Sequence, residues 1–248
     1  MSGRPRIEGL GPSLISLILH IRVSMPDYEA ERIRLVDSLK LRGYITSKEV
    51  ENAMKRIPRE NFVPPNMADE AYVDSPLPIG EGQTISAPHM VAIMIERLDL
   101  SPGMKVLEIG AGSGYHAAVC AEMIAPDGHV YTIERIPSLV RFAEDNLKKS
   151  GYSKLVTVVY GDGTKGLPEN APYDRIFVAA GAPDIPEPLV EQLADGGKML
   201  IPVGGRFYQD LIKVERKGRK ILKENLGGCV FVPLIGEHGH GGSQEVQM

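Results

Sequence analysis

The stretch "VLEIGAGSGY" (106–115) joins an apolar strand to a glycine-rich turn and to the start of a helix. Gly110, Gly112 and Gly114 would let a ligand approach the main chain closely at this turn. The spacing is not that of a dinucleotide fingerprint, because the third glycine comes one residue early and Tyr115 occupies the fingerprint position. The stretch therefore predicts a strand–turn–helix unit, either as a ligand site or as a tight turn alone.

Strand and helix patterns alternate along the chain on both sides of this unit. Strands are predicted at 105–109, 129–134, 155–162 and 173–181, and helices at 114–125, 137–151 and through 186–197. This order gives βαβ units, and hence a mostly parallel, doubly wound α/β sheet with helices on both faces. Late strands at 198–204, 210–216 and 229–235 leave no room for crossover helices, so we expect an antiparallel far edge.

The chain before residue 88 indicates an N-terminal helical and loop subdomain. Helices are predicted at 27–41 and from a capping box of Thr46 and Glu49 to Pro58, and the prolines of 58–82 indicate an ordered loop. A third helix begins near residue 88. The expected divisions are an N-terminal extension (1–24), this subdomain (25–87), a main domain (88–236) and a flexible, polar, glycine-rich tail (237–248).

Residues 14–23 form an apolar run that Arg4 and Arg6 precede. The run is shorter than the roughly 20 residues that a membrane span needs. His20 and Arg22 interrupt it, and no small-residue cleavage site follows. We therefore expect a non-catalytic extension, with Met25 as an alternative start, rather than a targeting segment or a membrane anchor.

Composition narrows the functional classes. The 248 residues carry 28 basic and 32 acidic side chains, a near balance that gives no electrostatic footprint for nucleic acid. The two cysteines, Cys120 and Cys229, are far apart and match neither a metal-ligand spacing nor a disulfide framework. We expect a cytoplasmic protein without a metal, in a reducing compartment.

Two acids extend the glycine turn into a candidate nucleoside site. Glu134 ends the second strand, where an acidic residue meets ribose hydroxyls, and Asp162 ends the third. The carboxyl ends of neighbouring strands form the ligand-binding edge of an open α/β sheet. The glycine loop has no lysine followed by serine or threonine after its glycines to cradle phosphates, so a nucleoside such as S-adenosylmethionine fits. The alternatives are a solvated strand end for Glu134 and an Asp-Gly turn for Asp162.

At this point the sequence resembles the protein-L-isoaspartate (D-aspartate) O-methyltransferases. The resemblance covers about 27–235 and includes "DSPLPIGEGQTISAPHM" (74–90), the glycine stretch, "GDG" (161–163) and "YDRIFVAAGAP" (173–183). It implies a Rossmann-like methyltransferase fold and methyl transfer from S-adenosyl-L-methionine to the free carboxylate of L-isoaspartyl residues in damaged proteins, leaving S-adenosyl-L-homocysteine. Partners would be isoaspartyl peptides and proteins, without nucleic acid or membrane, and we expect a monomer.

The resemblance also implies site residues. Those expected to bind the cofactor are Gln83, Thr84, Ser86, Glu108, Gly110, Gly112, Gly114, Glu134, Arg135, Gly161, Asp162 and Gly163. Those expected to bind the substrate are Ser86, His89, Ala179, Ala180, Gly181, Ala182, Val232 and Pro233. His116 and His129 are interpreted as structural.

Ser86 is the expected catalytic residue. A carboxylate is already ionised at neutral pH, so methyl transfer needs alignment and dry surroundings rather than a base. Short hydroxyl and amide donors suit this task, whereas a lysine or arginine in contact would repel the sulfonium and blunt the nucleophile. Pro88 favours a helix start that makes Ala87 the N-cap and leaves the Ser86 hydroxyl free.

Several alternatives stay open from the residues themselves. Ser86 or Thr84 could merely cap the helix, His89 could be a structural hydrogen bonder, and Val232 and Pro233 could be core. Among functions, the alternatives are a methyltransferase acting on a small molecule or RNA, a nicotinamide-dependent oxidoreductase, and a non-catalytic binding module.

Overall fold

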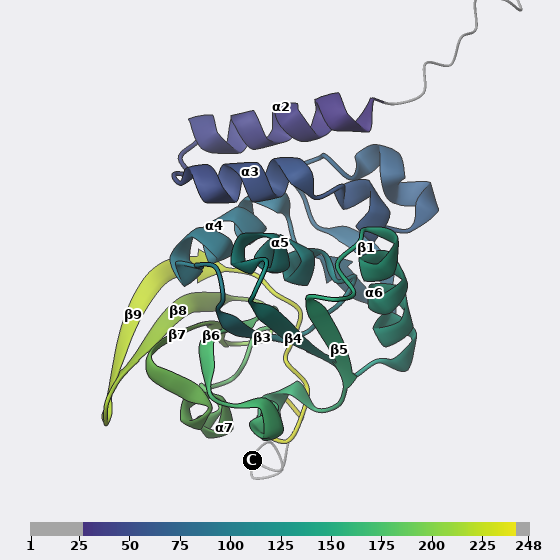
Figure 1. Cartoon of the computed structure of the whole chain (residues 1–248). Coiled ribbons are helices and arrows are strands. Elements are labelled where there is room, and N and C mark those ends of the chain that lie inside the picture. Colours follow the sequence, from purple (N-terminus) through teal and green to yellow (C-terminus); the bar gives the residue numbers. More distant parts are fainter. Residues whose placement is uncertain (1–26, 242–248) are drawn as a thin grey trace, which may run out of the picture.

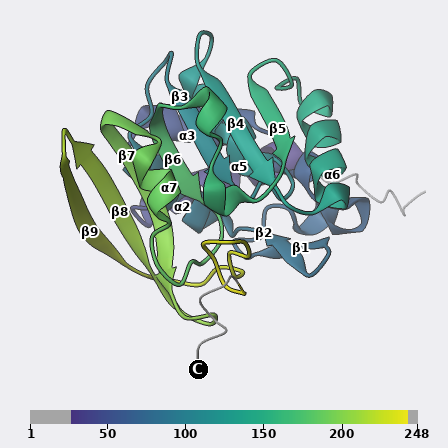
Figure 2. The same cartoon turned by 90° about the horizontal axis from the view of Figure 1, so that it is seen from below.

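A single mixed sheet organises the protein. The structure, a computed structural model, describes residues 27–241, so the expected extension at 1–24 and the end of the expected tail lie outside the described residues. Seven strands lie in the order β5-β4-β3-β6-β7-β8-β9 (Figures 1 and 2). Their bounds are β3 Lys105–Ile109, β4 His129–Glu134, β5 Val156–Tyr160, β6 Tyr173–Val178, β7 Leu193–Gly204, β8 Gln209–Lys217 and β9 Lys220–Cys229. The first five strands in this order are parallel, and β8 and β9 are antiparallel, as predicted.

Both faces of the sheet are covered, because strand residues alternate between two apolar clusters. Val106, Val130 and Phe177 face one cluster, which α4 (Pro88–Leu98), α5 (Tyr115–Ile124) and α6 (Pro137–Lys149) complete. Leu107, Ile133 and Ile176 face the other, together with Leu189 of the short α7 (Glu187–Glu191). The predicted Rossmann-like fold class is therefore confirmed.

The N-terminal subdomain lies over the first of these faces. α2 (Tyr28–Leu41) packs on α3 (Lys48–Arg56), and α3 packs on α4 and α5 (Figure 1). Two short 3₁₀ helices, η1 (Arg59–Phe62) and η2 (Pro65–Glu70), and a hairpin of β1 (Leu77–Gly80) and β2 (Gln83–Ile85) lead into α4. The hairpin brings residues 83–86 toward the carboxyl edge of the sheet.

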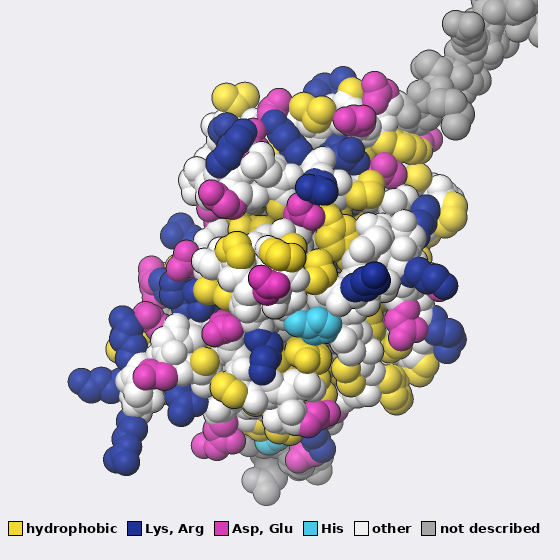
Figure 3. Space-filling model, in the orientation of Figure 1, with side chains coloured by type: hydrophobic (Ala, Val, Ile, Leu, Met, Phe, Trp, Pro, Cys, Tyr) yellow, Lys and Arg dark blue, Asp and Glu magenta, His cyan; other side chains and the backbone are white. Residues whose placement is uncertain are grey.

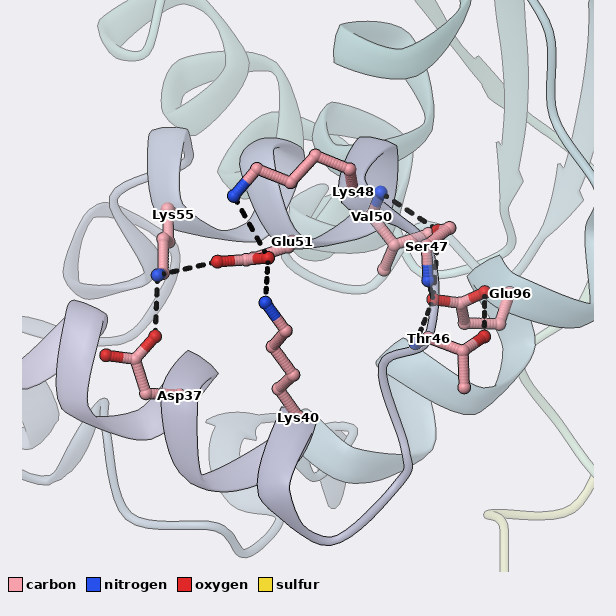
Figure 4. A network of polar contacts seen from close by, with 9 residues as sticks. All are labelled: Asp37, Lys40, Thr46, Ser47, Lys48, Val50, Glu51, Lys55 and Glu96. Carbon is pink, nitrogen blue, oxygen red and sulfur yellow. Dashed lines mark hydrogen bonds and ion pairs between the residues drawn. The ribbon is translucent and has the colours of Figure 1, made fainter.

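The prediction of a capping box at Thr46 and Glu49 is wrong. Ser47 is the N-cap of α3, and its hydroxyl accepts from the Val50 N–H at 3.3 Å. The Glu96 carboxylate of α4 instead accepts from the N–H groups of Thr46 and Ser47, both at 2.8 Å (Figure 4). A carboxylate from another helix thus replaces the local partner that the sequence pattern suggested.

Glu51 anchors α3 to α2. Its carboxylate pairs with Lys40 at 2.7 Å, Lys55 at 2.9 Å and Lys48 at 3.2 Å (Figure 4). These bonds to Lys40, Lys55 and Lys48 hold the pKa of Glu51 down at about 2. The carboxylate therefore stays charged through the neutral range and ties the two outer helices together.

Two late predictions are also wrong. The helix predicted through 186–197 is only the short α7 (Glu187–Glu191), because the chain from Leu193 onward belongs to β7. The last strand is β9 at 220–229, not 229–235, where Gly181 and Pro233 make only an isolated parallel bridge. β9 is an edge strand exposed along most of its length, so it lacks the apolar pattern that marks a buried strand.

No helix within residues 27–241 is long and apolar enough to cross a membrane. Acidic and basic side chains intermingle over α2 and α3, and Lys and Arg side chains gather around the tip of the β8–β9 hairpin (Figure 3).

Candidate active site

The glycine turn is closely held by the sheet and by α6. Gly110, Gly112 and Gly114 all have positive φ, at 94°, 54° and 84°. A Cβ on Gly114 would also lie 3.1 Å from Leu147 Cγ of α6, so a side chain there would be strained by its conformation and would also press on Leu147. Gly110 and Gly112 line the main pocket, whereas Gly114 lies behind it as the N-cap of α5.

Glu134 fastens the turn from the neighbouring strand. One carboxylate oxygen accepts from the Gly112 N–H at 3.0 Å, and the other accepts from the N–H groups of Arg135 and Ile136 at 2.8 and 3.0 Å. The side chain is almost fully buried and lines the pocket. Glu134, which was predicted to bind the ribose, therefore also holds the glycine turn in its conformation.

Glu108 is a fully buried acid in the pocket wall. Its Oε2 accepts from the Thr132 hydroxyl at 2.6 Å, and its Oε1 has no partner among the described residues. Burial, opposed by the Thr132 bond and reinforced by the charge of Glu134, raises the pKa of Glu108 to about 8. At neutral pH without a ligand the side chain is mainly protonated, and its free oxygen needs a polar partner.

Residues 83–86 form another part of the pocket wall, and Gln83, Thr84 and Ser86 all line the pocket. α4 begins at Pro88 with Ala87 as its N-cap, and no side-chain cap comes from its own segment. Asp74 supplies the missing acceptor from a distance, since its Oδ1 accepts from the His89 N–H at 2.9 Å. Within the described chain the Ser86 hydroxyl consequently makes no hydrogen bond and remains available to a ligand.

His89 lies outside the pocket lining. Its Nδ1 is 2.9 Å from the same Asp74 oxygen, and its ring lies against Tyr44 at 5.5 Å between centroids. Asp74 also pairs with Arg42. The structure therefore ties His89 to a polar cluster at the start of α4, which matches the structural alternative.

The "GDG" acid lies beside the main pocket. Gly163 lines the main pocket, while Gly161 and Asp162 line an adjoining one that shares Arg135 and Ile235 with it. Asp162 accepts from the Thr164 N–H at 2.9 Å and from the Glu237 N–H at 2.9 Å. Residues 237–240, expected in a flexible tail, thus pack against this edge, and His240 is buried.

The loop residues 179–182, which were expected to bind the substrate, divide into two pairs. Ala179 and Ala180 line the pocket, as do Val232 and Pro233 on the opposite segment. Gly181 and Ala182 are buried behind them, where the Gly181 N–H donates to the Val232 carbonyl at 2.8 Å. A Cβ on Gly181 would lie 2.7 Å from the Gln209 side chain, so this glycine serves packing rather than ligand approach.

The two histidines taken as structural differ in position. His129 lies on β4, where its Nε2 is 2.8 Å from the Thr157 hydroxyl. His116 lines the pocket, packs tilted against Phe177 at 4.4 Å between ring centroids, and has a buried Nε2 without a partner among the described residues. Burial, followed by the charge of Arg59, lowers the pKa of His116 to about 3, so the ring is neutral.

The pocket as a whole fits a nucleoside with an amino-acid tail. It encloses about 940 Å³ including its open mouth, and its remaining walls are mainly apolar. Its polar groups include the two acids Glu108 and Glu134, the hydroxyls of residues 84 and 86, and the unpartnered nitrogen of His116. The unpartnered Glu108 oxygen needs a polar partner, which an ammonium would supply once the carboxyl ionises, and no lysine lines the pocket, so the residues fit S-adenosyl-L-methionine.

Comparison with known proteins identifies the family. Residues 30–239 match the family model of the protein-L-isoaspartate(D-aspartate) O-methyltransferases. The chain belongs to this family. A protein-L-isoaspartate O-methyltransferase from Methanopyrus kandleri is 62% identical over 213 residues, which cover 86% of this chain and 94% of that one. One from Hyperthermus butylicus is 58% identical over 86% of this chain and 91% of that one.

Solved structures agree with this assignment. A Plasmodium falciparum crystal structure assigned to the same enzymes is in complex with S-adenosyl-L-homocysteine. It has a TM-score of 0.75 at 32% identity, over 82% of this chain and 98% of that one. The chain is therefore an S-adenosyl-L-methionine-dependent methyltransferase of L-isoaspartyl residues in damaged proteins and peptides. This assignment removes the oxidoreductase, the small-molecule methyltransferase and the binding module as alternatives.

Proposed function

We propose that the main pocket performs this reaction with its two walls divided between cofactor and acceptor. Glu134 and the glycine turn would hold the nucleoside, with Gly163 and Arg135 beside it. Glu108, whose free oxygen is buried in the same pocket, would meet the ammonium of the methionine moiety. When bound, S-adenosyl-L-methionine supplies an electrophilic methyl group on a sulfonium.

The acceptor half belongs to residues 83–86. We assign the Ser86 hydroxyl as the donor that orients the isoaspartyl carboxylate, because it lies in the pocket and no capping role occupies it. Gln83 and Thr84 line the same wall and would flank the methionine end of the cofactor. The unit at 25–87 is thus a part of the substrate site as well as a cover for the sheet.

These residues align groups rather than move protons. An isoaspartyl carboxylate is ionised at neutral pH, so no base has to prepare it. A neutral hydroxyl fixes one carboxylate oxygen without neutralising the other, and side chains such as Ile85, Val91 and Ile136 exclude water around it. Ala179, Ala180, Val232 and Pro233 would border the polypeptide that carries the carboxylate.

The test is methylation of an isoaspartyl peptide with labelled S-adenosyl-L-methionine, against the same peptide with normal aspartate. We expect label only in the isoaspartyl peptide, and a large loss of rate in Ser86→Ala with unchanged binding of S-adenosyl-L-homocysteine. Equal labelling of both peptides would contradict the substrate assignment, and an unchanged rate would remove Ser86 from the site.

We also propose that the enzyme acts in the cytoplasm as a monomer without a nucleic-acid partner. Cys120 and Cys229 are buried free thiols, which suit a reducing compartment. The formal charge of −4 does not favour binding to nucleic acid. Size-exclusion chromatography with light scattering would contradict the monomer if the mass were a multiple of 27.0 kDa.

A further inference from the structure

Beneath Ser86 lies a buried cation that the reaction described above does not use. Arg59, the first residue of η1, is 0% exposed. It makes no ion pair with any described carboxylate, although Asp74, already bonded to Arg42 and His89, acts on it at longer range. Burial lowers the pKa of Arg59, but an arginine stays protonated at neutral pH. Burying a cation that has no ion-pair partner costs free energy, which suggests that the charge of Arg59 has a function.

The guanidinium joins the two walls of the pocket from behind. Its Nη2 donates to the Ser86 carbonyl at 2.9 Å, and its Nε donates to the Ala71 carbonyl at 2.8 Å. Its Cζ lies 4.9 Å from the centroid of the Tyr115 ring, which lines the pocket at the start of α5. Nη1 is buried and has no partner among the described residues. Arg59 therefore fixes the main chain of the residue that we assign to the acceptor.

The charge of Arg59 also reaches the pocket interior. It contributes to the low pKa of His116, a pocket residue, after the larger effect of burial. Since Arg59 does not line the pocket and its Nη2 is bonded to the Ser86 carbonyl, it can attract an anion nearby without occupying the lone pairs that the anion needs for reaction. A positive charge in direct contact would have taken up those lone pairs.

We propose that Arg59 is a positioning residue for the methyl acceptor, holding Ser86 in place and drawing the isoaspartyl carboxylate into the pocket by its charge. The inference rests on the proposed role of Ser86. It has a second consequence that does not depend on Ser86: the same charge should weaken binding of the positively charged sulfonium cofactor relative to the thioether product.

Two ligand pairs that differ by one charge test the proposal. The first is S-adenosyl-L-methionine against S-adenosyl-L-homocysteine, compared by calorimetric Kd. The second is an isoaspartyl peptide against its neutral isoasparaginyl analogue, compared by Kd in the presence of S-adenosyl-L-homocysteine. In Arg59→Met we expect the affinity for S-adenosyl-L-methionine, relative to S-adenosyl-L-homocysteine, to rise severalfold. The preference for the isoaspartyl peptide over its isoasparaginyl analogue should fall about tenfold. Arg59→Lys should keep both preferences and lose mainly kcat, because it retains the charge without the planar fork.

Arg175 provides a matched control. It too is a buried arginine, but its Nη2 donates to the carbonyl of Asp99, which is not a pocket residue, at 2.9 Å, and it lies near Asp99 Oδ2 at 3.8 Å. Arg175→Met should lower thermal stability and leave both ligand preferences unchanged.

Unchanged preferences in Arg59→Met would overturn the proposal and make Arg59 structural only. Arg59→Gln, which keeps a donor for the Ser86 carbonyl, serves if the methionine variant does not fold. If neither Arg59→Met nor Arg59→Gln folds, a shift of the cofactor preference or of the peptide preference in Arg59→Lys would overturn the proposal. A normal rate in Ser86→Ala together with a shifted sulfonium preference in Arg59→Met would refute the role of Ser86 but not the effect of the charge.

Discussion

Replacing Glu108 with glutamine should change how stability depends on pH. The pKa of Glu108 is about 8 in the folded protein against an ordinary value of 4.5. Over this interval the folded state keeps a proton that the unfolded chain releases, so stability falls as the pH rises. The slope is about 1.4 kcal/mol per pH unit and flattens near pH 8, which makes the loss between pH 6 and pH 8 about 2 kcal/mol.

Glutamine removes this titration and keeps an oxygen that can accept from the Thr132 hydroxyl. The assay is denaturant unfolding of both proteins at pH 6, 7 and 8 without ligand, with the free energy extrapolated to water. Groups such as His116, which titrate in both proteins, cancel in the difference. Relative to the wild type, the free energy of unfolding of Glu108→Gln should rise by about 2 kcal/mol between pH 6 and pH 8.

Glu51→Gln is the matched control, because the pKa of Glu51 lies below its ordinary value, at about 2. The stability that this carboxylate contributes is present above pH 4.5 and is lost only as the pH falls toward 2. This variant should therefore lose the same stability at pH 6 and pH 8. If Glu108→Gln ran parallel to the wild type as the control does, Glu108 would be ionised in the folded protein and the reasoning would fail.

Three further outcomes follow from the site. Binding of S-adenosyl-L-homocysteine at pH 7 should release somewhat less than one proton, measured by calorimetry in buffers of different ionisation enthalpy, and none in Glu108→Gln. Glu134→Gln should weaken cofactor binding by about 1–3 kcal/mol, because a charged acceptor of the Gly112 N–H is lost, and an unchanged Kd would argue against the assignment. Asp74→Ala should destabilise the protein by about 1 kcal/mol and lower kcat, since α4 loses its remote cap; a stability equal to wild type would show that the cap is dispensable.

Local patterns sufficed for most strands of the sheet and for part of the site. The strands at 105–109 and 129–134 and the turn at 110–114 were predictable, because buried strands and glycine turns leave short-range signatures. The adjacency of Glu134 and the glycine turn also followed from the topology, since parallel strands end at one edge. The edge strand β9 was missed because an exposed strand has no apolar alternation to mark it.

Other parts of the site had no sequence signal. Nothing local showed that His116 would line the pocket or that His89 would turn away from it toward Asp74. Asp162, expected to end the third strand, lies two residues beyond the end of β5, and its bond to residue 237 depends on how the C-terminal segment folds back.

The sequence by itself determined the alternating order of strands and helices from β3 to β6, the glycine turn and a serine that its own helix does not need as a cap. Only the tertiary structure decided what surrounds that serine: Asp74 caps α4 in its place, and Arg59 holds its carbonyl. The physical reason is that burial periodicity repeats within a few residues and can be found locally. Buried polar groups instead take whichever partner the packing brings near, and those partners lie 15 and 27 residues away in the chain.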